Sequence, residues 1–262
     1  MTCRKTIQMT LSNEQLDILF RCVGGGPIDK AKILVFGNEL GTAEGGGNTE
    51  VTINKFVNDW TSKPTLKVGP GFVTTSIGQM PVNSVFLQCI SRMALAIRYK
   101  EDRFFDQLTG EGRAVLNKYI LEELYRTETA VINLKPLPQS TERHWDYNNV
   151  NESKYHKLFN FNLYNAPDSP WKQLRLSVMK EAFKICQNAL ILGSGDKHNK
   201  KTFLKLMYPE VEFEDIILEN NIQIYVSKKP KIILSNYYSP YTGLGLDGLK
   251  ILYHYIEKSG LI

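Results

Sequence analysis

The chain has 262 residues, of which 42% are hydrophobic and 23% are charged. This composition excludes a mainly disordered chain, a collagen-like repeat and a coiled coil, and it is typical of an ordinary globular protein. Lys and Arg number 32 against 27 Asp and Glu, which gives a net charge of +5. That charge favours the approach of a polyanion such as nucleic acid but does not require one.

The cysteines indicate a reducing compartment. Cys3, Cys22, Cys89 and Cys186 stand far apart, and no C-x-x-C pair points to zinc, an iron–sulfur cluster or a redox motif. The N-terminal residues lack the apolar core of a signal peptide, and no apolar run reaches the ~18 residues of a membrane span. We therefore expect a soluble, cytoplasmic protein with free thiols and no membrane partner.

Four short, continuous apolar runs predict strands that are buried on both faces. In chain order they cover residues 33–36, 130–134, 189–192 and 232–234. Apolar residues at helical spacing lie between and after these runs, within 87–97, 115–124, 174–186 and 249–256. This alternation predicts an α/β fold: a three-layer, doubly wound, mainly parallel four-stranded sheet with helices on both faces.

The chain shows no internal repeat and no low-complexity tract that would divide it. We therefore expect a single domain over residues 1–262, with a partly helical insertion around 48–128. Gly, Pro, Ser and Thr are frequent in 61–81, and 148–170 is polar and rich in aromatic residues. Both segments are predicted to be irregular excursions from the sheet that overhang a site.

In such sheets ligands bind at the carboxyl ends of the strands, so the residues that follow each run are candidates for function. The first run leads into Gly37-Asn38-Glu39-Leu40-Gly41, and the second ends in Asn133-Leu134-Lys135-Pro136-Leu137-Pro138. The third leads from Leu192 into Gly193-Ser194-Gly195, and the fourth into Ser235-Asn236-Tyr237-Tyr238-Ser239-Pro240. Taken in this order, the four strand ends resemble those of the uracil-DNA glycosylase superfamily.

The resemblance implies a function for each strand end. In that family the first turn holds the residue that positions water, and an Asn at the end of the second strand reads the flipped base. The third strand ends in Leu-Gly before a helix, and a loop after the fourth strand enters the minor groove. A glycosylase fold, DNA as partner, and neither metal nor cofactor are the corresponding expectations.

The sequence also departs from the family pattern. Leu40 replaces the usual Pro of the first turn, and Tyr237 stands where the last loop carries a His. About 90 residues separate Gly41 from Asn133, which is long for the family. These departures predict a pocket reshaped for a base other than plain uracil, with a modified pyrimidine as the hypothesis.

The resemblance gives catalytic roles to Glu39, Asn38 and Tyr237. Substrate-binding roles fall to Gly37, Gly41, Asn133, Lys135, Gly193, Ser194, Asn236, Tyr238 and Ser239. A carboxylate at Glu39 would position water and stabilise positive charge on the sugar, and an amide at Asn133 can both donate to and accept from a base. Simpler structural roles stay open: Glu39 as a helix cap, Asn133 in an Asx turn, and tyrosines in the core.

The expected function is a monofunctional DNA glycosylase that flips out a base and hydrolyses its glycosidic bond, leaving an abasic site. A non-catalytic nucleic-acid-binding module with this fold and a nucleotide-binding hydrolase are the alternatives. A basic rim for the DNA backbone is a further hypothesis, against the plainer one of solvated lysines. Its members are Lys197, Lys200, Lys201, Lys205, Lys228, Lys229 and Lys231.

Overall fold

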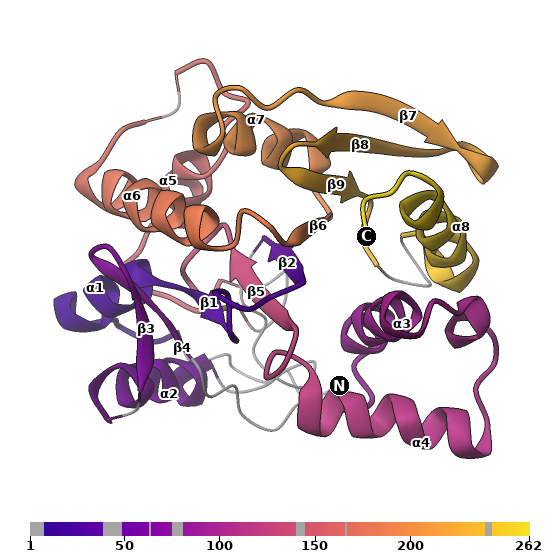
Figure 1. Ribbon diagram of the computed structural model, residues 1–262. Helices are drawn as coiled ribbons and strands as arrows, with labels where there is room; N and C mark the ends of the chain where they lie inside the picture. The colour runs from indigo at the N-terminus through magenta and orange to yellow at the C-terminus, as the bar shows by residue number, and fades with distance from the viewer. Residues whose placement is uncertain are drawn as a thin grey trace, which may run out of the picture.

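The computed structural model describes residues 8–38, 49–62, 64–74, 81–139, 145–165, 167–238 and 243–262. In this part of the chain a nine-stranded mixed sheet runs through the molecule (Figure 1). From one edge to the other its strands are β3 (Thr65–Val68), β4 (Gly71–Thr74), β1 (Cys22–Gly25), β5 (Thr129–Asn133), β2 (Ile33–Gly37), β6 (Leu190–Ser194), β9 (Lys231–Ser235), β8 (Ile222–Lys228) and β7 (Glu214–Leu218).

The prediction of a mainly parallel four-stranded sheet is wrong. The four apolar runs form β2, β5, β6 and β9, which are adjacent and mutually parallel. Strands of mixed direction extend this centre on both sides. β1 is antiparallel to β5 and parallel to β4, while β3, β7 and β8 each join an antiparallel neighbour.

Most of the added strands are short, rich in glycine or exposed, whereas β8 is longer and largely buried. β1 has two glycines, and Gly24 lies so close to β5 that a β-carbon would sit 1.8 Å from the Val131 carbonyl oxygen. The β3–β4 hairpin lies inside the 61–81 segment, so residues 65–74 of that segment belong to the sheet and are not the irregular excursion expected. β7 forms one edge of the sheet, and Ile217 on it is 70% exposed.

Helices cover both faces of the sheet (Figure 1). Alternate residues of β2 separate the two cores, with Ile33 and Val35 on one side and Leu34 and Phe36 on the other. The first face carries α3 (Val85–Tyr99), η1 (Asp102–Phe105), α4 (Gly110–Lys118), the π-helix η2 (Tyr119–Glu123) and α8 (Gly245–Lys258). The second carries α6 (Pro170–Ile185) and α7 (Lys197–Met207).

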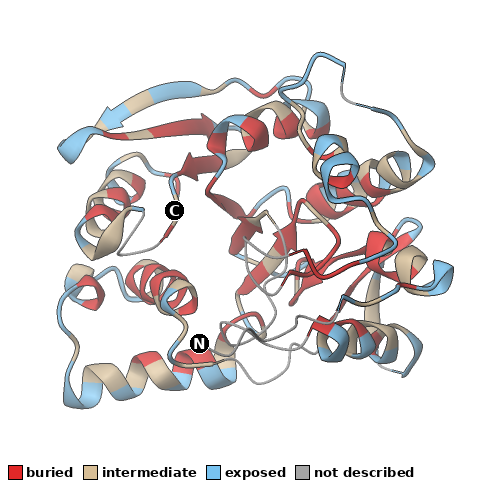
Figure 2. Cartoon of the chain, turned by 180° about the vertical axis from the view of Figure 1, so that it is seen from behind, coloured by how far each residue is buried: buried red, intermediate tan, exposed pale blue. Residues whose placement is uncertain are grey.

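A third apolar cluster completes the core beside α6. It is formed by α1 (Asn13–Arg21), α2 (Thr49–Ser62) and α5 (Glu152–Leu158) together with the end of α6 that carries Trp171. Figure 2 shows that the strands at the centre of the sheet are buried, whereas the outer helix surfaces are exposed. α5 lies within the 148–170 segment, which was expected to be irregular.

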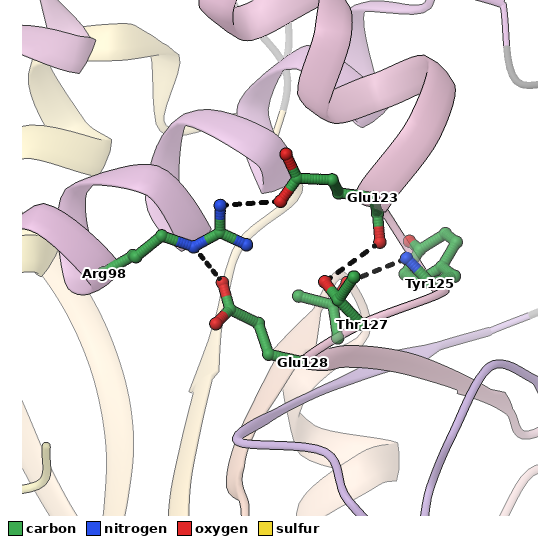
Figure 3. A network of polar contacts seen from close by, with 6 residues as sticks. Arg98, Glu123, Tyr125, Thr127 and Glu128 are labelled. Carbon is green, nitrogen blue, oxygen red and sulfur yellow. Dashed lines mark hydrogen bonds and ion pairs between the residues drawn. The ribbon is translucent and has the colours of Figure 1, made fainter.

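An ionic network fixes the first face to the sheet. Figure 3 shows the Arg98 guanidinium of α3 between the carboxylates of Glu123 in η2 and Glu128. Both N–O distances are 2.7 Å, and Glu128 immediately precedes β5. The contacts therefore tie α3 to the start of the strand that ends in Asn133.

Two further features bear on the sequence predictions. No helix in the described ranges has the length and apolar character needed to cross a membrane. Cys22, Cys89 and Cys186 are free and buried, while Cys3 lies outside the described residues. The 48–128 segment supplies helices on both sides and the β3–β4 hairpin, and its interpretation as an insertion into a single domain stays a prediction.

Candidate functional site at the carboxyl ends of the central strands

The structure brings four strand ends together in register. Gly37 at the end of β2 pairs with Asn133 at the end of β5, and Phe36 pairs with Gly193 of β6. Ser194 in turn pairs with Ser235 at the end of β9. We call this row of strand ends, together with Asn38, the carboxyl edge. Five of the predicted site residues lie on it: Gly37, Asn38, Asn133, Gly193 and Ser194.

Three of the predicted site residues cannot be located. Glu39, Gly41 and Ser239 lie outside the described residues. The proposed neighbourhood of the Glu39 carboxylate and the Asn133 amide therefore stays a prediction.

Asn133 has an unused hydrogen-bond donor. The residue is 3% exposed, and its Nδ2 has no hydrogen-bond partner in the described part of the chain. A β-carbon at Gly37 would lie 2.3 Å from Asn133 Oδ1, so an α-hydrogen of Gly37 points towards that oxygen. Such a contact suits an oxygen and not an NH2 group, which leaves the N–H bonds of Nδ2 available.

The backbone beyond Asn133 continues to follow the β2 end. Leu134 N–H donates to the Gly37 carbonyl at 3.1 Å, and Lys135 N–H donates to the Asn38 carbonyl at 2.6 Å. Lys135 itself is half-buried. These bonds hold the two amide-bearing residues, Asn38 and Asn133, on neighbouring stretches of backbone.

Lys200 of α7 lies beneath the carboxyl edge and is fully buried. Its Nζ donates to the carbonyls of Ser194 at 2.7 Å and Gly195 at 2.8 Å, and also to Asn38 Oδ1. Because an ammonium group only donates, Asn38 must present its oxygen to Lys200. The close approach at Gly193 is to the next strand, because a β-carbon there would lie 2.4 Å from Leu234 Cδ2, whereas Lys200 Cδ would be at an ordinary contact distance of 3.4 Å.

Sequence reasoning placed Lys200 on a DNA-facing rim and missed this role. The signal was present in the sequence, because Lys200 occupies the apolar stripe of α7 with Phe203, Leu204 and Met207. A lysine at that spacing, in the helix that follows a buried strand, indicates a buried amine and not a solvated one.

The loop after β9 divides its residues between surface and core. Asn236 is exposed and Tyr237 is half-buried. The Tyr237 ring covers Gly195, where a β-carbon would lie 2.4 Å from Tyr237 Cε2 and where φ is +70°. Gly195 is therefore required both by its left-handed backbone and by the ring above it.

Tyr238, predicted to bind substrate, lies in the core. Its exposed fraction is 0%, and its ring stacks with Phe86 of α3 at 6.5 Å between centroids. Burial raises the pKa of its phenol to about 12. Its N–H donates to Ser194 Oγ at 3.1 Å, so Tyr238 anchors the loop to β6.

The predicted lysine rim is not continuous. Lys197 is 8% exposed, its Nζ donates to the Gln223 carbonyl at 2.8 Å, and burial lowers its pKa. Lys228, Lys229 and Lys231 lie at the β8–β9 turn. That turn precedes β9 and is at the opposite end of the strand from Ser235, so these lysines do not flank the carboxyl edge.

The described residues of the site can form hydrogen bonds with a polar ligand, and they include no evident nucleophile. Its groups are the buried amide of Asn133, the half-buried amide of Asn38, a buried ammonium and the hydroxyl of Ser194. Among the described residues, no group of three or more His, Cys, Asp or Glu side chains is arranged to hold a metal ion. Comparisons of the chain with protein-family models, with curated proteins and with solved structures found no significant match.

Proposed function

We propose that this chain is a monofunctional DNA glycosylase that binds an extruded base at the carboxyl edge. One observation carries the proposal: the nearly fully buried Asn133 amide, at a strand end beside Gly37, has a donor with no partner among the described residues. A buried donor without a partner is costly, and a ligand that accepts its hydrogen bond removes that cost. The same residue holds the base-reading place in the sequence resemblance.

The chemistry follows from charge. Breaking an N-glycosidic bond leaves positive charge on the deoxyribose and negative charge on the departing base. Donors from Asn133 stabilise the base as its charge grows, and Lys200 adds a positive charge behind Asn38. Glu39 positions a water molecule, whose hydroxyl bonds to the sugar carbon while its proton passes to the departing base.

The proposed substrate is DNA that contains a modified pyrimidine. The sequence changes at Leu40 and Tyr237 support a base other than plain uracil, because both fall where relatives of the resembled family shape the pocket. The packing of Tyr237 on Gly195 holds this ring beside the β6 end. A phenol there can stack on a base exposed by flipping.

The test is the release of bases from DNA. Single- and double-stranded oligonucleotides carrying uracil or one of several modified pyrimidines are incubated with the protein, and abasic sites are revealed by alkaline cleavage. We expect strand cleavage with at least one modified pyrimidine, and its loss in Glu39→Gln and Asn133→Ala. Asn54→Ala, which removes an exposed amide from α2, serves as the control and should keep full activity.

The same experiment examines the second candidate, a nucleic-acid-binding module without catalysis. The absence of His from the last loop and the packed position of Tyr237 favour it. Binding of the oligonucleotides without abasic sites from any of them would support this module and contradict the glycosylase. Hydrolysis of free nucleotides without action on DNA would instead support a nucleotide hydrolase.

A further inference from the structure

A buried arginine lies behind the Asn133 backbone. Arg175 of α6 is 1% exposed, and no carboxylate pairs with it among the described residues. Its guanidinium donates instead to four main-chain carbonyls. Nε bonds to Leu134 at 3.2 Å, one terminal nitrogen bonds to Phe20 at 3.3 Å and Cys22 at 2.6 Å, and the other bonds to Asn133.

Burying the Arg175 guanidinium among carbonyls costs free energy, whereas an apolar side chain could fill the same space without that cost. Removing a cation from water without an opposite charge is unfavourable, and burial lowers the pKa of Arg175 to about 10. The planar fork of a guanidinium, with five N–H donors, can bind carbonyls from separate segments at once. Here it joins the end of α1, the start of β1 and the end of β5.

The two peptide groups that follow the Asn133 α-carbon each make hydrogen bonds through both their C=O and their N–H. The carbonyl of Asn133 accepts from Arg175, and the following N–H of Leu134 donates to Gly37. The carbonyl of Leu134 also accepts from Arg175, and the following N–H of Lys135 donates to Asn38. Arg175 therefore holds the β5 end against the β2 end at the point where Asn38 and Asn133 stand.

We propose that Arg175 is a positioning residue for the candidate site, which fixes the Asn133 amide and its register with Asn38. This inference rests on the proposed base-binding role of Asn133. Arg175 acts through the backbone and has no direct contact with the ligand. Because a displacement of about 1 Å can cost a hundredfold in rate, loosening this anchor should impair base release more than it impairs folding.

The test compares two matched variants, Arg175→Lys and Arg92→Lys. Arg92 of α3 is also buried, at 5% exposure, and also donates to main-chain carbonyls, those of Phe104 and Asp106, but on the first face of the sheet. Both changes should lower stability. Only Arg175→Lys should shift or broaden the Asn133 side-chain amide signal in NMR spectra and speed the exchange of the Leu134 and Lys135 amide hydrogens.

Activity provides the second measurement. For Arg175→Lys we expect kcat per folded molecule to fall by about tenfold to a hundredfold with little change in KM, and for Arg92→Lys we expect neither to change. Equal effects of the two variants on the Asn133 signal and on kcat would overturn the proposal. If the wild-type protein releases no base, the glycosylase assignment fails, and the Asn133 signal alone still decides the role of Arg175.

A measurement on the unaltered protein covers the case in which Arg175→Lys does not fold. Titration with a single-stranded oligonucleotide bearing an uncleavable pyrimidine analogue should shift the Arg175 Nε–H resonance and leave that of Arg92 in place. A ligand-induced shift at the Asn133 amide without any at Arg175 would overturn the proposal. A shift at both supports the coupling through the Asn133 and Leu134 carbonyls.

Discussion

At the scale of single residues, the geometry of the site depends on glycines, whose lack of a side chain allows close contacts. Gly37→Ala would put a methyl group 2.3 Å from Asn133 Oδ1, so the amide would have to move. We expect a loss of about 1–3 kcal/mol in the free energy of unfolding, because overpacking at a tight contact has that cost. Base release should fall further than stability does. Urea denaturation and the abasic-site assay measure the two effects.

Gly112→Ala is the control for this prediction. Gly112 lies in the first turn of α4, where a β-carbon would meet only the flexible Leu108 side chain, at 3.1 Å from Cδ2. Alanine is favoured over glycine in the middle of a helix by roughly 0.5–1 kcal/mol, and a smaller gain in the same direction is expected in the first turn, so this variant should be slightly more stable. If the two alanine variants change stability in the same direction, the account of Gly37 is wrong.

Sequence reasoning found part of the site and missed the residues beneath it. Gly37, Asn133 and Ser194 could be predicted to be neighbours because the carboxyl ends of parallel strands meet at one edge. The place of Lys200 in the apolar stripe of α7 could have revealed its burial, but Arg175 could not be assigned, since its partners are main-chain carbonyls far away in the sequence. A carbonyl carries no signal in the sequence, so a buried cation bound to distant carbonyls is visible only in three dimensions.

At the scale of elements, the strands that could be predicted are those whose burial leaves a pattern in their own sequence. β2, β5, β6 and β9 are buried on both faces, and continuous apolar runs reveal them. The sequence of β8 has aliphatic residues at every second position, Ile222, Ile224 and Val226, and a search for period two could have detected it. β1 carries two glycines, and its place in the sheet follows from its pairing with β4 and β5 and not from its own sequence.

The contacts of Arg98 make a prediction about α3 and β5. Arg98→Met removes two ion pairs with partly buried carboxylates and a cation–π contact with Tyr119 at 4.9 Å. We expect a loss of about 1–2 kcal/mol in the free energy of unfolding, less than for a fully buried pair because each partner keeps some solvent. Thermal and urea unfolding should agree on this value.

Arg103→Met is the matched control for the Arg98 change. Arg103 pairs with Glu101, but its side chain is 69% exposed, and pairs of that kind contribute little. Its loss should stay below about 0.5 kcal/mol. Losses of equal size in the two variants would mean that the network in Figure 3 does not hold α3 to β5.

At the scale of the whole molecule, the interior is divided into several apolar cores. The three described cysteines lie in three different ones. Cys89 lies in the core beneath α3 and α8, Cys186 in the core beneath α6 and α7, and Cys22 beside α2. Burial raises the pKa of Cys89 to about 11 and those of Cys22 and Cys186 to about 12, from 9.0. Ionisation of these thiols therefore reports on opening of the cores.

The direction of the resulting pH dependence follows from linkage. Below pH 9 the thiols are protonated in both the folded and the unfolded chain, so they do not change stability with pH. Between pH 9 and about 11 they ionise only in the unfolded chain, which binds fewer protons than the folded one. The free energy of unfolding should therefore fall across this range, with a slope of up to about 1.4 kcal/mol per pH unit for each thiol.

A variant with Cys22, Cys89 and Cys186 all replaced by Ala separates the thiols from the tyrosines and lysines that titrate nearby. Its unfolding free energy, measured by urea denaturation from pH 8 to pH 11, should decline less steeply than that of the wild-type protein.

Alkylation by iodoacetamide, followed residue by residue with mass spectrometry, gives a second measurement of how well the thiols are buried. In the native protein at pH 8 these three thiols should react far more slowly than in urea, because buried thiols stay protonated and inaccessible. Equal slopes in the two proteins, or rapid alkylation of the native thiols, would show that the cores open far more readily than their burial implies.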